Sequence, residues 1–414
     1  MKTPTLPAVA VFGIFAFTYL FSALLRAVTA TLAPVFSREL GLQAADLGLL
    51  AGAYFFGFAA TQLPLGGALD RYGPRRTLMV LLAVAVLGCI AFALAPNLPA
   101  MIAARVLIGV GVGACLMAPL TCYRTLFTSS AQLRANSWML MTGSLGMVAS
   151  TLPVQWLLPT LGWRGLFWAI AAVLLVSTGL VAWGAPRVLA STAAGSAVGS
   201  GTQDAAALGH GGYLAIARHP LFMRLAPLGF WVYGGLIAVQ SLWAGPWLTR
   251  VGGATAEQAA RGLFTINLAM LCTFMTWGAV MPRLARRGIG ALRLVAWGVP
   301  LALCLLALNI ASGAAAGPWH WAAWCMACSF VAVSQPAIGA AFPVQQVGRA
   351  LSAFNLVIFS GVFCIQWGIG LVIDGLRHHG IAEPDAMRLA FAAFGLGGVL
   401  AYLWFLRVRR VALP

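Results

Sequence analysis

Two long apolar runs are joined by the turn Gly66-Gly67-Ala68-Leu69-Asp70-Arg71-Tyr72-Gly73-Pro74-Arg75-Arg76, which has the pattern G-x-x-x-D-R-x-G-x-R-R. Charged residues make up only 8% of the 414-residue chain, so an aspartate and three arginines so close together stand out from the composition. Charge between apolar runs is typical of the short loops that join membrane-spanning helices. The turn therefore indicates that the runs on either side of it are spans.

The composition excludes an ordinary water-soluble protein, because 61% of the residues are hydrophobic. Only helices and closed barrels satisfy backbone hydrogen bonds inside a bilayer, and apolar runs of about 20 residues have the length of a spanning helix. We predict an all-α polytopic membrane protein with about twelve helices. The predicted spans are 8–34, 45–69, 77–95, 99–121, 136–158, 164–185, 221–248, 259–281, 291–312, 319–342, 351–373 and 387–407.

A segment rich in Ser, Gly, Ala and Thr separates the sixth and seventh predicted helices, over residues 190–212. Such a composition is typical of a flexible linker. We therefore predict an N-terminal six-helix bundle at 1–187, a flexible cytoplasmic linker at 188–218 and a C-terminal six-helix bundle at 219–414.

The net charge of +17 does not indicate nucleic-acid binding, because the 25 Lys and Arg residues are spread between apolar runs. Most of them fall in the loops on the side of the two termini, and cytoplasmic loops are those that retain Lys and Arg. We expect both termini to be cytoplasmic, in the inner (plasma) membrane of a bacterial-type cell. The apolar N-terminus has no short h-region with a cleavage site, so we interpret it as a retained first helix.

The eleven-residue turn resembles the loop between the second and third helices of the major facilitator superfamily of membrane transporters. A second resemblance lies in Arg105-Val106-Leu107-Ile108-Gly109-Val110-Gly111-Val112-Gly113, an arginine followed by closely spaced glycines, although Ile108 stands where that family usually has Gln. The resemblance implies two pseudo-symmetric six-helix bundles with a site between them near the bilayer midplane. A decayed copy of the turn fits this repeat, with Gly278, Arg283 and Arg287 at the spacing of Gly66, Arg71 and Arg75.

The aspartate of the turn ends the second predicted helix, where a carboxylate is unfavourable against the negative end of the helix dipole. We expect Asp70 to find a positive partner at the start of the eleventh helix. The resemblance implies a cytoplasmic latch between the halves, whose candidate residues are Gly66, Asp70, Arg71, Gly73, Arg75, Arg283 and Arg349. The alternative for Arg75 and Arg76 is that they only orient the chain in the membrane.

Two arginines fall inside predicted spans, and an intramembrane arginine is expected to face the bundle interior or a wet cavity. Arg26 lies beyond the middle of the first span and Arg105 before the middle of the fourth, which places both at a similar depth. We predict that they clamp a small anion, with Tyr19 beside Arg26 as a further contact. The alternative is that one of the two is structural, for example by binding backbone carbonyls.

All eight acidic residues fall at predicted span ends or in loops. A cation-exporting drug/proton antiporter normally needs a carboxylate within the membrane. The sequence therefore favours an anionic or neutral substrate, and it leaves coupling protons without an evident carrier.

Amide side chains and one tryptophan in the predicted spans of the second half are further candidates for the cavity, because they orient a ligand without adding charge. Interhelical hydrogen bonding is the alternative role for each of them. These candidates are Gln240, Trp243, Asn267, Gln335, Asn355 and Gln366.

Sulfur residues suggest an alternative cargo, because thiolates and thioethers suit copper(I). Cys325 and Cys328 lie in the tenth predicted span, with Met270 and Met275 in the eighth, but both residue types are also ordinary packing residues. The sequence leaves this open. The eight cysteines fall in or beside apolar runs, so no disulfide framework is expected.

We find no nucleotide-binding loop and no catalytic grouping, so we predict no enzyme activity, no cofactor and no resident metal. The favoured function is secondary active transport of a small organic anion by alternating access, by a monomer in the lipid bilayer. The alternatives are a copper or neutral-solute importer, or a receptor that retains the fold without transport. Substrate, direction and coupling ion are not determined by the sequence.

Overall fold

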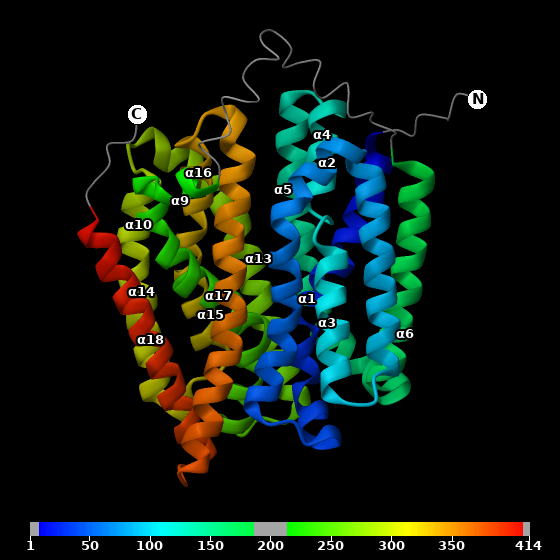
Figure 1. The fold of residues 1–414 in the computed structure, drawn as a ribbon. Helices are drawn as coiled ribbons and strands as arrows, with labels where there is room; N and C mark the ends of the chain where they lie inside the picture. The colour runs from blue at the N-terminus through cyan, green and yellow to red at the C-terminus, as the bar shows by residue number, and fades with distance from the viewer. Residues whose placement is uncertain (1–7, 186–212, 409–414) are drawn as a thin grey trace.

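The computed structural model describes residues 8–185 and 213–408, which fold into helices with no strand among them. The helices form two bundles that stand side by side, the first half of the chain in one and the second half in the other (Figure 1). We call the end where α1 begins and α18 ends the terminal end, and the opposite end the distal end. The predicted all-α fold is confirmed.

The first bundle contains the elements up to the middle of the chain. Two of its long helices are each interrupted by a glycine with positive φ, Gly73 (φ 77°) in α2 and Gly162 (φ 64°) in α6. The charged turn therefore joins two spans, Ala44–Leu69 and Arg71–Leu94, at the terminal end. The elements are α1 Ala8–Leu40, α2 Ala44–Leu94, α3 Leu98–Val112, α4 Met117–Leu126, α5 Ser129–Ala149 and α6 Leu152–Gly184.

The second bundle begins with short segments that together form the span Pro220–Val251, in which α-helical and π-helical turns alternate. Of the predicted linker, residues 188–212 lie outside the described chain and Tyr213–Arg218 form helix α9. The elements are α9, α10 Pro220–Leu228, η2 Gly229–Tyr233, α11 Gly234–Ala238, η3 Val239–Trp243, α12 Ala244–Pro246, η4 Trp247–Val251, α13 Ala256–Arg286, α14 Ala291–Ser312, η5 Gly313–Ala315, α15 Pro318–Cys328, η6 Ser329–Val333, α16 Ser334–Ala340, α17 Val344–His378 and α18 Glu383–Arg407.

Eleven helices of the described chain are long and apolar enough to cross a membrane. The predicted fifth span, 136–158, is wrong in its bounds: α5 begins at Ser129 and is broken at residues 150–151 before α6. Here the Ser150 hydroxyl donates to the carbonyl of Met147, and the Thr151 hydroxyl donates to that of Val148. Pro153 then opens α6, where its missing N–H costs nothing. The predicted spans 8–34 and 351–373 also end too early, because α1 continues to Leu40 and α17 continues to His378.

Helix starts at the distal end are fixed by local side chains. Asn97 accepts a hydrogen bond from the N–H of Ala100 (3.0 Å) at the start of α3. At the start of α13, the side chain of Gln258 accepts from the N–H of Thr255, whose hydroxyl accepts from the N–H of Gln258. These caps satisfy N–H groups that have no partner within the helix.

The two bundles meet most closely where α2 packs against α17. A Cβ on Gly48 would lie 2.3 Å from the carbonyl oxygen of Gln366, and one on Gly370 would lie 2.4 Å from that of Ala44. Backbone approach of this kind requires a residue without a side chain. The glycines therefore permit a tight joint between the halves toward the distal end.

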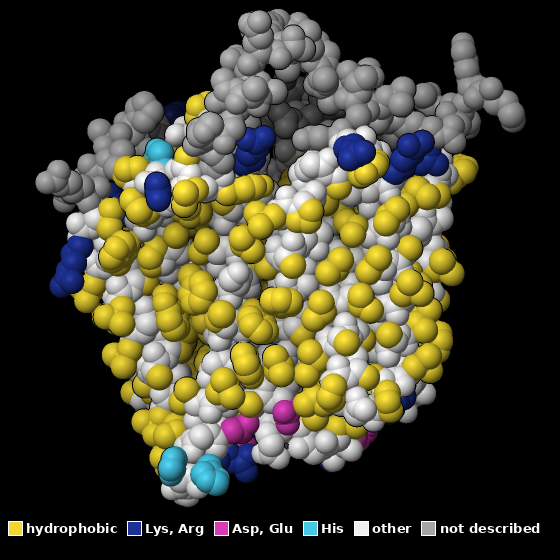
Figure 2. All heavy atoms as spheres, in the orientation of Figure 1, with side chains coloured by type: hydrophobic (Ala, Val, Ile, Leu, Met, Phe, Trp, Pro, Cys, Tyr) yellow, Lys and Arg dark blue, Asp and Glu magenta, His cyan; other side chains and the backbone are white. Residues whose placement is uncertain are grey.

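Charge is distributed unequally between the two ends. Figure 2 shows most of the visible Arg side chains along the terminal end and a few at the distal end, where the visible Asp and Glu side chains also lie. The surface between them is largely apolar, as expected of a surface in contact with lipid hydrocarbon.

Candidate functional site

Arg26 lies within α1 among aromatic side chains. Its guanidinium lies over the ring of Phe58, 5.8 Å from the centroid, and interacts with the side chains of Tyr19 and Tyr54. Within the described part of the chain, its Nε is buried without a hydrogen-bond partner. The site thus offers a cation with unused donor capacity.

Tyr233 extends this cluster across the interface between the halves. It lies in η2 of the second bundle, yet its side chain is close enough to interact electrostatically with Arg26 of the first. Sequence analysis missed this residue, because one tyrosine in an apolar run carries no signal of the helix it will face. The only local hint is its position directly before Gly234 and Gly235.

Arg105 is more enclosed, with 1% of its surface exposed. Its Nη1 donates to the carbonyl of Leu25 (3.1 Å), and its guanidinium lies 5.7 Å from the ring centroids of both Tyr54 and Phe92. Its Nε has no partner within the described chain. These are the contacts that the structural alternative predicts for this arginine.

Tyr54 connects the two arginines. Its hydroxyl donates to the carbonyl of Ser22 (3.2 Å), and its side chain contacts both guanidinium groups. Arg105 also bonds the carbonyl of the residue next to Arg26. The structure therefore places both arginines around one tyrosine, with Arg26 the closer to the second bundle.

The glycines after Arg105 bring the helices together. A Cβ on Gly109 would lie 2.0 Å from the carbonyl oxygen of Tyr54, and one on Gly111 would lie 2.2 Å from the N of Ala85. Both contacts are with α2, which packs closely against α3. The glycine pattern thus sets the position of Arg105 relative to Tyr54.

The candidate amides of the second half bind one another. Gln240 donates to the side-chain oxygen of Asn267 (2.9 Å), and the side-chain N–H of Asn267 donates to the carbonyl of Leu263 (2.8 Å). Trp243 donates to the carbonyl of Gln366 (3.1 Å). Gln366 also donates to the hydroxyl of Ser241 (3.0 Å). Gln335 donates to the side-chain oxygen of Asn355 (2.7 Å), and these two residues form a separate pair.

The first of these groups lies against the helix of Arg26. η3, which carries Gln240 and Trp243, packs against α1. Gln335 and Asn355 join α16 to α17 instead. The η3 residues Gln240 and Trp243 therefore lie beside the helix that carries Arg26, whereas Gln335 and Asn355 lie at a separate place between α16 and α17.

Carboxylates of the described chain lie at the ends of helices. Asp70 stands between two spans, and its side chain is not described. Asp204 lies outside the described residues. The other six acids are in the first or last turns of helices or near them, at Glu39, Asp46, Glu257, Asp374, Glu383 and Asp385.

The predicted latch lies at the terminal end. Arg71 stacks over Tyr72, 5.3 Å from its ring centroid, and Nη2 of Arg75 donates to the carbonyl of Ala182. Arg283 donates to the carbonyl of Ala279 (2.7 Å), and Arg349 is exposed. A Cβ on Gly66 would meet no atom within 4 Å, so no close contact requires glycine there. Because the side chain of Asp70 is not described, the latch remains a prediction.

A polar contact between the halves that sequence analysis missed lies at the distal end. The carboxylate of Asp374 accepts hydrogen bonds from the N–H groups of Ala44 (3.2 Å) and Ala45 (2.7 Å), at the start of α2. Arg377 donates to the side-chain oxygen of Gln43 (3.3 Å). The available signal was that Asp374 is one of only eight acids in the chain.

A second cross-half contact at that end involves Arg250. It forms an ion pair with Glu383 (2.6 Å) within the second bundle and donates to the hydroxyl of Ser37 (2.7 Å) in the first. The distal end is thus joined by several polar contacts as well as by the glycine packing.

Among the described residues, no group of three or more His, Cys, Asp and Glu side chains could hold a metal ion. Cys325, Cys328 and Met270 are buried, whereas Met275 is 51% exposed. Methionine thioethers are outside this set of residue types, so the copper alternative is not tested by it and stays a prediction.

A sequence profile of the Major Facilitator Superfamily matches residues 15–330. The chain belongs to this superfamily. It is a multi-pass integral membrane protein and a transporter, as predicted, and not an enzyme. The predicted twelve-helix superfamily fold is likewise confirmed.

Two curated relatives match parts of the chain. One is the 4-hydroxybenzoate transporter PcaK of Acinetobacter baylyi, 26% identical over 35% of this chain. The other is the probable sulfoacetate transporter SauU of Cupriavidus necator, 26% identical over 25% of this chain. The matches span only 33% and 24% of the length of these relatives.

Solved structures share the fold over nearly the whole chain. A bacterial homolog of the human lysosomal transporter Spinster, in an inward-facing unoccupied conformation, has a TM-score of 0.71 and 16% identity, covering 95% of each chain. A D-xylose–proton symporter has a TM-score of 0.71 and 17% identity, covering 97% of this chain and 98% of its own. At these identities the similarity establishes the fold alone.

Proposed function

We propose that this transporter carries a small organic anion by alternating access, and that Arg26 is the group that binds it. The observation that supports this most directly is the unpartnered Nε of Arg26, in a cluster to which both halves contribute. A guanidinium presents a planar set of donors that matches a carboxylate or sulfonate. A cation in the membrane interior is costly unless a partner compensates it, and a bound anion is such a partner.

The surrounding residues have distinct roles in this proposal. Tyr19 and Tyr54 position the guanidinium, and the Tyr19 hydroxyl can donate to a bound oxyanion, whereas the Tyr54 hydroxyl already donates to the carbonyl of Ser22. Arg105 adds positive potential behind Tyr54 while its donor to Leu25 fixes its place. Tyr233, Gln240 and Asn267 bring neutral polar groups from the second half. The clamp is therefore asymmetric, with its positive charge on the first bundle.

The relatives support the anionic class without defining the substrate. One carries the name of a 4-hydroxybenzoate transporter and the other that of a probable sulfoacetate transporter. Both compounds are organic anions at neutral pH. Since each match covers a minor part of the relative, we extend only the class of substrate to this chain.

The contacts at the two ends of the interface between the bundles support alternating access. In the described conformation, Asp374 and the α2–α17 glycines close the distal end. We expect the latch of Asp70, Arg71 and Arg349 to form when the terminal end closes instead. The basic terminal end supports our proposal that this end is cytoplasmic, in an inner membrane. Under this proposal, the closed distal end faces away from the cytoplasm.

Binding and uptake by the purified full-length protein test this proposal. We expect 4-hydroxybenzoate or sulfoacetate to raise the thermal unfolding temperature, because a ligand stabilises the state that it binds. We expect Arg26→Gln to abolish that shift and to lower uptake into proteoliposomes by about 100-fold, the loss of a charged bidentate contact.

Arg134→Gln is the matched control, since Arg134 is an exposed arginine of the first bundle away from the cluster. If Arg26→Gln leaves anion uptake unchanged in a folded protein, the anion site lies elsewhere. A thermal shift with neutral sugars or copper(I), and none with either anion, would favour the alternative substrates. Anion binding without flux in sealed vesicles would favour a receptor.

A further inference from the structure

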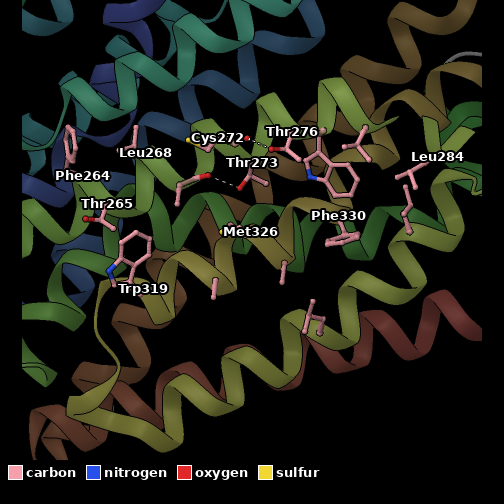
Figure 3. A pocket seen from close by; sticks show the side chains of 17 residues that line it. Phe264, Thr265, Leu268, Cys272, Thr273, Thr276, Leu284, Trp319, Met326 and Phe330 are labelled. Atoms are coloured by element: carbon pink, nitrogen blue, oxygen red, sulfur yellow. Dashed lines mark hydrogen bonds between the residues drawn. The ribbon is translucent and has the colours of Figure 1, made fainter. Parts of the chain in front are cut away.

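A groove of about 920 Å³ lies on the second bundle, away from the Arg26 cluster. It is lined mainly by α13 and α15, with Leu294 and Leu301 of α14 and Phe330 of η6, and none of the candidate substrate residues lines it. Figure 3 shows Leu284 at one end and Phe264, Thr265 and Trp319 at the other. From Phe264 to Leu284, α13 covers about 30 Å, the thickness of the bilayer hydrocarbon core.

The lining offers an occupant almost no hydrogen bonds. The hydroxyls of Thr265, Thr273 and Thr276 donate to backbone carbonyls one turn earlier in α13, at 2.7–3.0 Å. The indole N–H of Trp277 donates to the hydroxyl of Ser329 (2.8 Å). These donors are already used, and the rest of the lining is apolar apart from the indole N–H of Trp319 at its edge. The groove therefore suits a hydrocarbon chain.

One end of the groove is strongly basic. Leu284 and Leu294 line it on either side of the turn between α13 and α14. The exposed arginines at this turn are Arg286 at the end of α13, Arg287 in the turn and Arg293 in the first turn of α14. The ion pairs found in the described chain do not involve these arginines. No Asp or Glu occurs anywhere between Glu257 and Asp374. The positive charge at this end is thus not neutralised by neighbouring sequence.

The distal end of the groove has a different character. Trp319 lies near the start of α15 and is 72% exposed. Tryptophan is enriched at membrane–water interfaces, where its indole reaches the head-group level. The groove thus extends from one interface to the other. Near its distal end, Arg261 is paired with Glu257 (2.6 Å), whereas the ion pairs of the described chain include none of the three arginines at the terminal end.

We propose that this groove binds an anionic phospholipid of the terminal-side leaflet, with an acyl chain in the terminal half of the groove along α13 and α14 and the phosphate at Arg286, Arg287 and Arg293. Basic pockets between spanning helices are suited to anionic lipid head groups, and the cytoplasmic leaflet is the one rich in them. An apolar channel with unpaired arginines at one end matches a molecule with one anionic end and a hydrocarbon tail. This inference does not depend on the identity of the transported substrate.

Lipid binding to the full-length protein in neutral detergent tests this inference. We expect phosphatidylglycerol to remain bound in native mass spectrometry and to raise the thermal unfolding temperature more than phosphatidylcholine does. The variant Arg286→Gln/Arg287→Gln/Arg293→Gln should weaken phosphatidylglycerol binding by about tenfold. Arg134→Gln/Arg218→Gln/Arg407→Gln removes the same charge at other exposed positions and should leave the binding unchanged.

A second pair of variants tests the acyl-chain part without altering charge. Leu301 lines the groove and is 48% exposed, whereas Leu308 is on the same helix, 52% exposed and not part of the lining. Leu301→Trp should fill the groove and reduce the bound phosphatidylglycerol, and Leu308→Trp should not.

Three results would overturn the proposal. Equal binding of phosphatidylglycerol and phosphatidylcholine would show that the groove does not recognise an anionic head group. Equal losses in the two arginine triple variants would show that only overall charge matters. A dimer that Leu301→Trp converts to a monomer would show that a second copy of the chain, and not a lipid, occupies the groove.

Discussion

The carboxylate of Asp374, near the end of α17, accepts a hydrogen bond of 2.7 Å from the backbone N–H of Ala45, at the start of α2. It also accepts one from the adjacent N–H of Ala44 (3.2 Å). An acid from one bundle thus caps a helix of the other, where the positive end of the helix dipole favours negative charge. The contact exists only while the distal end is closed, so it contributes to the stability of that conformation alone.

Asp374→Asn should therefore shift the transporter toward the conformation that is open at the distal end. Asparagine keeps one acceptor oxygen but loses the negative charge, and a charge at a helix N-terminus is worth about 0.3–1 kcal/mol, so the population ratio should change by about 2- to 5-fold. The measurement is the distance between spin labels at positions 40 and 379, in a chain whose exposed cysteines 272, 304 and 364 have been replaced. A longer distance should become more populated.

The control for this variant is Asp385→Asn at the same end. Asp385 pairs with Arg388 of its own helix (3.3 Å) and is exposed, so it makes no contact that depends on closure. If both variants broaden the label distances equally, or neither does, Asp374 does not hold the distal end closed.

Close packing at Gly370 provides a second prediction. A Cβ there would lie 2.4 Å from the carbonyl oxygen of Ala44, a distance that requires the backbones to separate. Gly370→Ala should impair distal closure and lower uptake by about 5- to 150-fold, because the penalty of overpacking is about 1–3 kcal/mol. Gly368→Ala is the control, since a Cβ at Gly368 meets nothing within 4 Å on the same helix. Equal uptake by the two variants would contradict the prediction.

Much of the fold was accessible from the sequence because the bilayer restricts the possibilities. The apolar runs and the Asp70–Arg76 turn defined spans and connections, and the spacing of glycines after Arg105 indicated close packing with another helix. The break at residues 150–151 was not accessible, because Ser150 and Thr151 look like ordinary small residues within an apolar run. Their hydroxyl bonds to nearby carbonyls appear only in the folded chain.

The candidate site was accessible only in part, for a similar reason. Arg26 and Arg105 stood out because charge inside a span is rare. Their different surroundings depend on which rings pack against them, and Tyr54 lies in another helix. Tyr233 and Asp374 act across the two halves, so their roles depend on how the bundles dock and not on local sequence.

Arg105 and Arg26 should respond differently to lysine. Arg105→Lys should destabilise the protein by about 1–3 kcal/mol, because a lysine cannot both donate to Leu25 and lie flat between Tyr54 and Phe92. Arg26→Lys should leave the thermal unfolding temperature nearly unchanged and weaken anion binding, since it keeps the charge and loses the planar set of donors. Both variants are compared by thermal unfolding with and without anion. The reverse order of effects would make Arg105 the binding residue.

Tyr233→Phe tests whether the second bundle contributes to the anion site. The hydroxyl is the only group lost. It interacts electrostatically with Arg26 across the interface, and in our proposal it donates a hydrogen bond to the anion. Removing one hydrogen bond to a charged group costs about 1.5–3 kcal/mol, so the Kd for the anion should rise by at least about tenfold. Tyr402→Phe is the matched control, because the Tyr402 hydroxyl donates to the carbonyl of Ala296 (2.9 Å), within the second bundle. Since Tyr233 reaches Arg26 from the opposite half, its loss should also weaken the coupling between binding and closure. Uptake should therefore fall further than binding alone accounts for, and an unchanged Kd in a folded Tyr233→Phe protein would place the anion wholly on the first bundle.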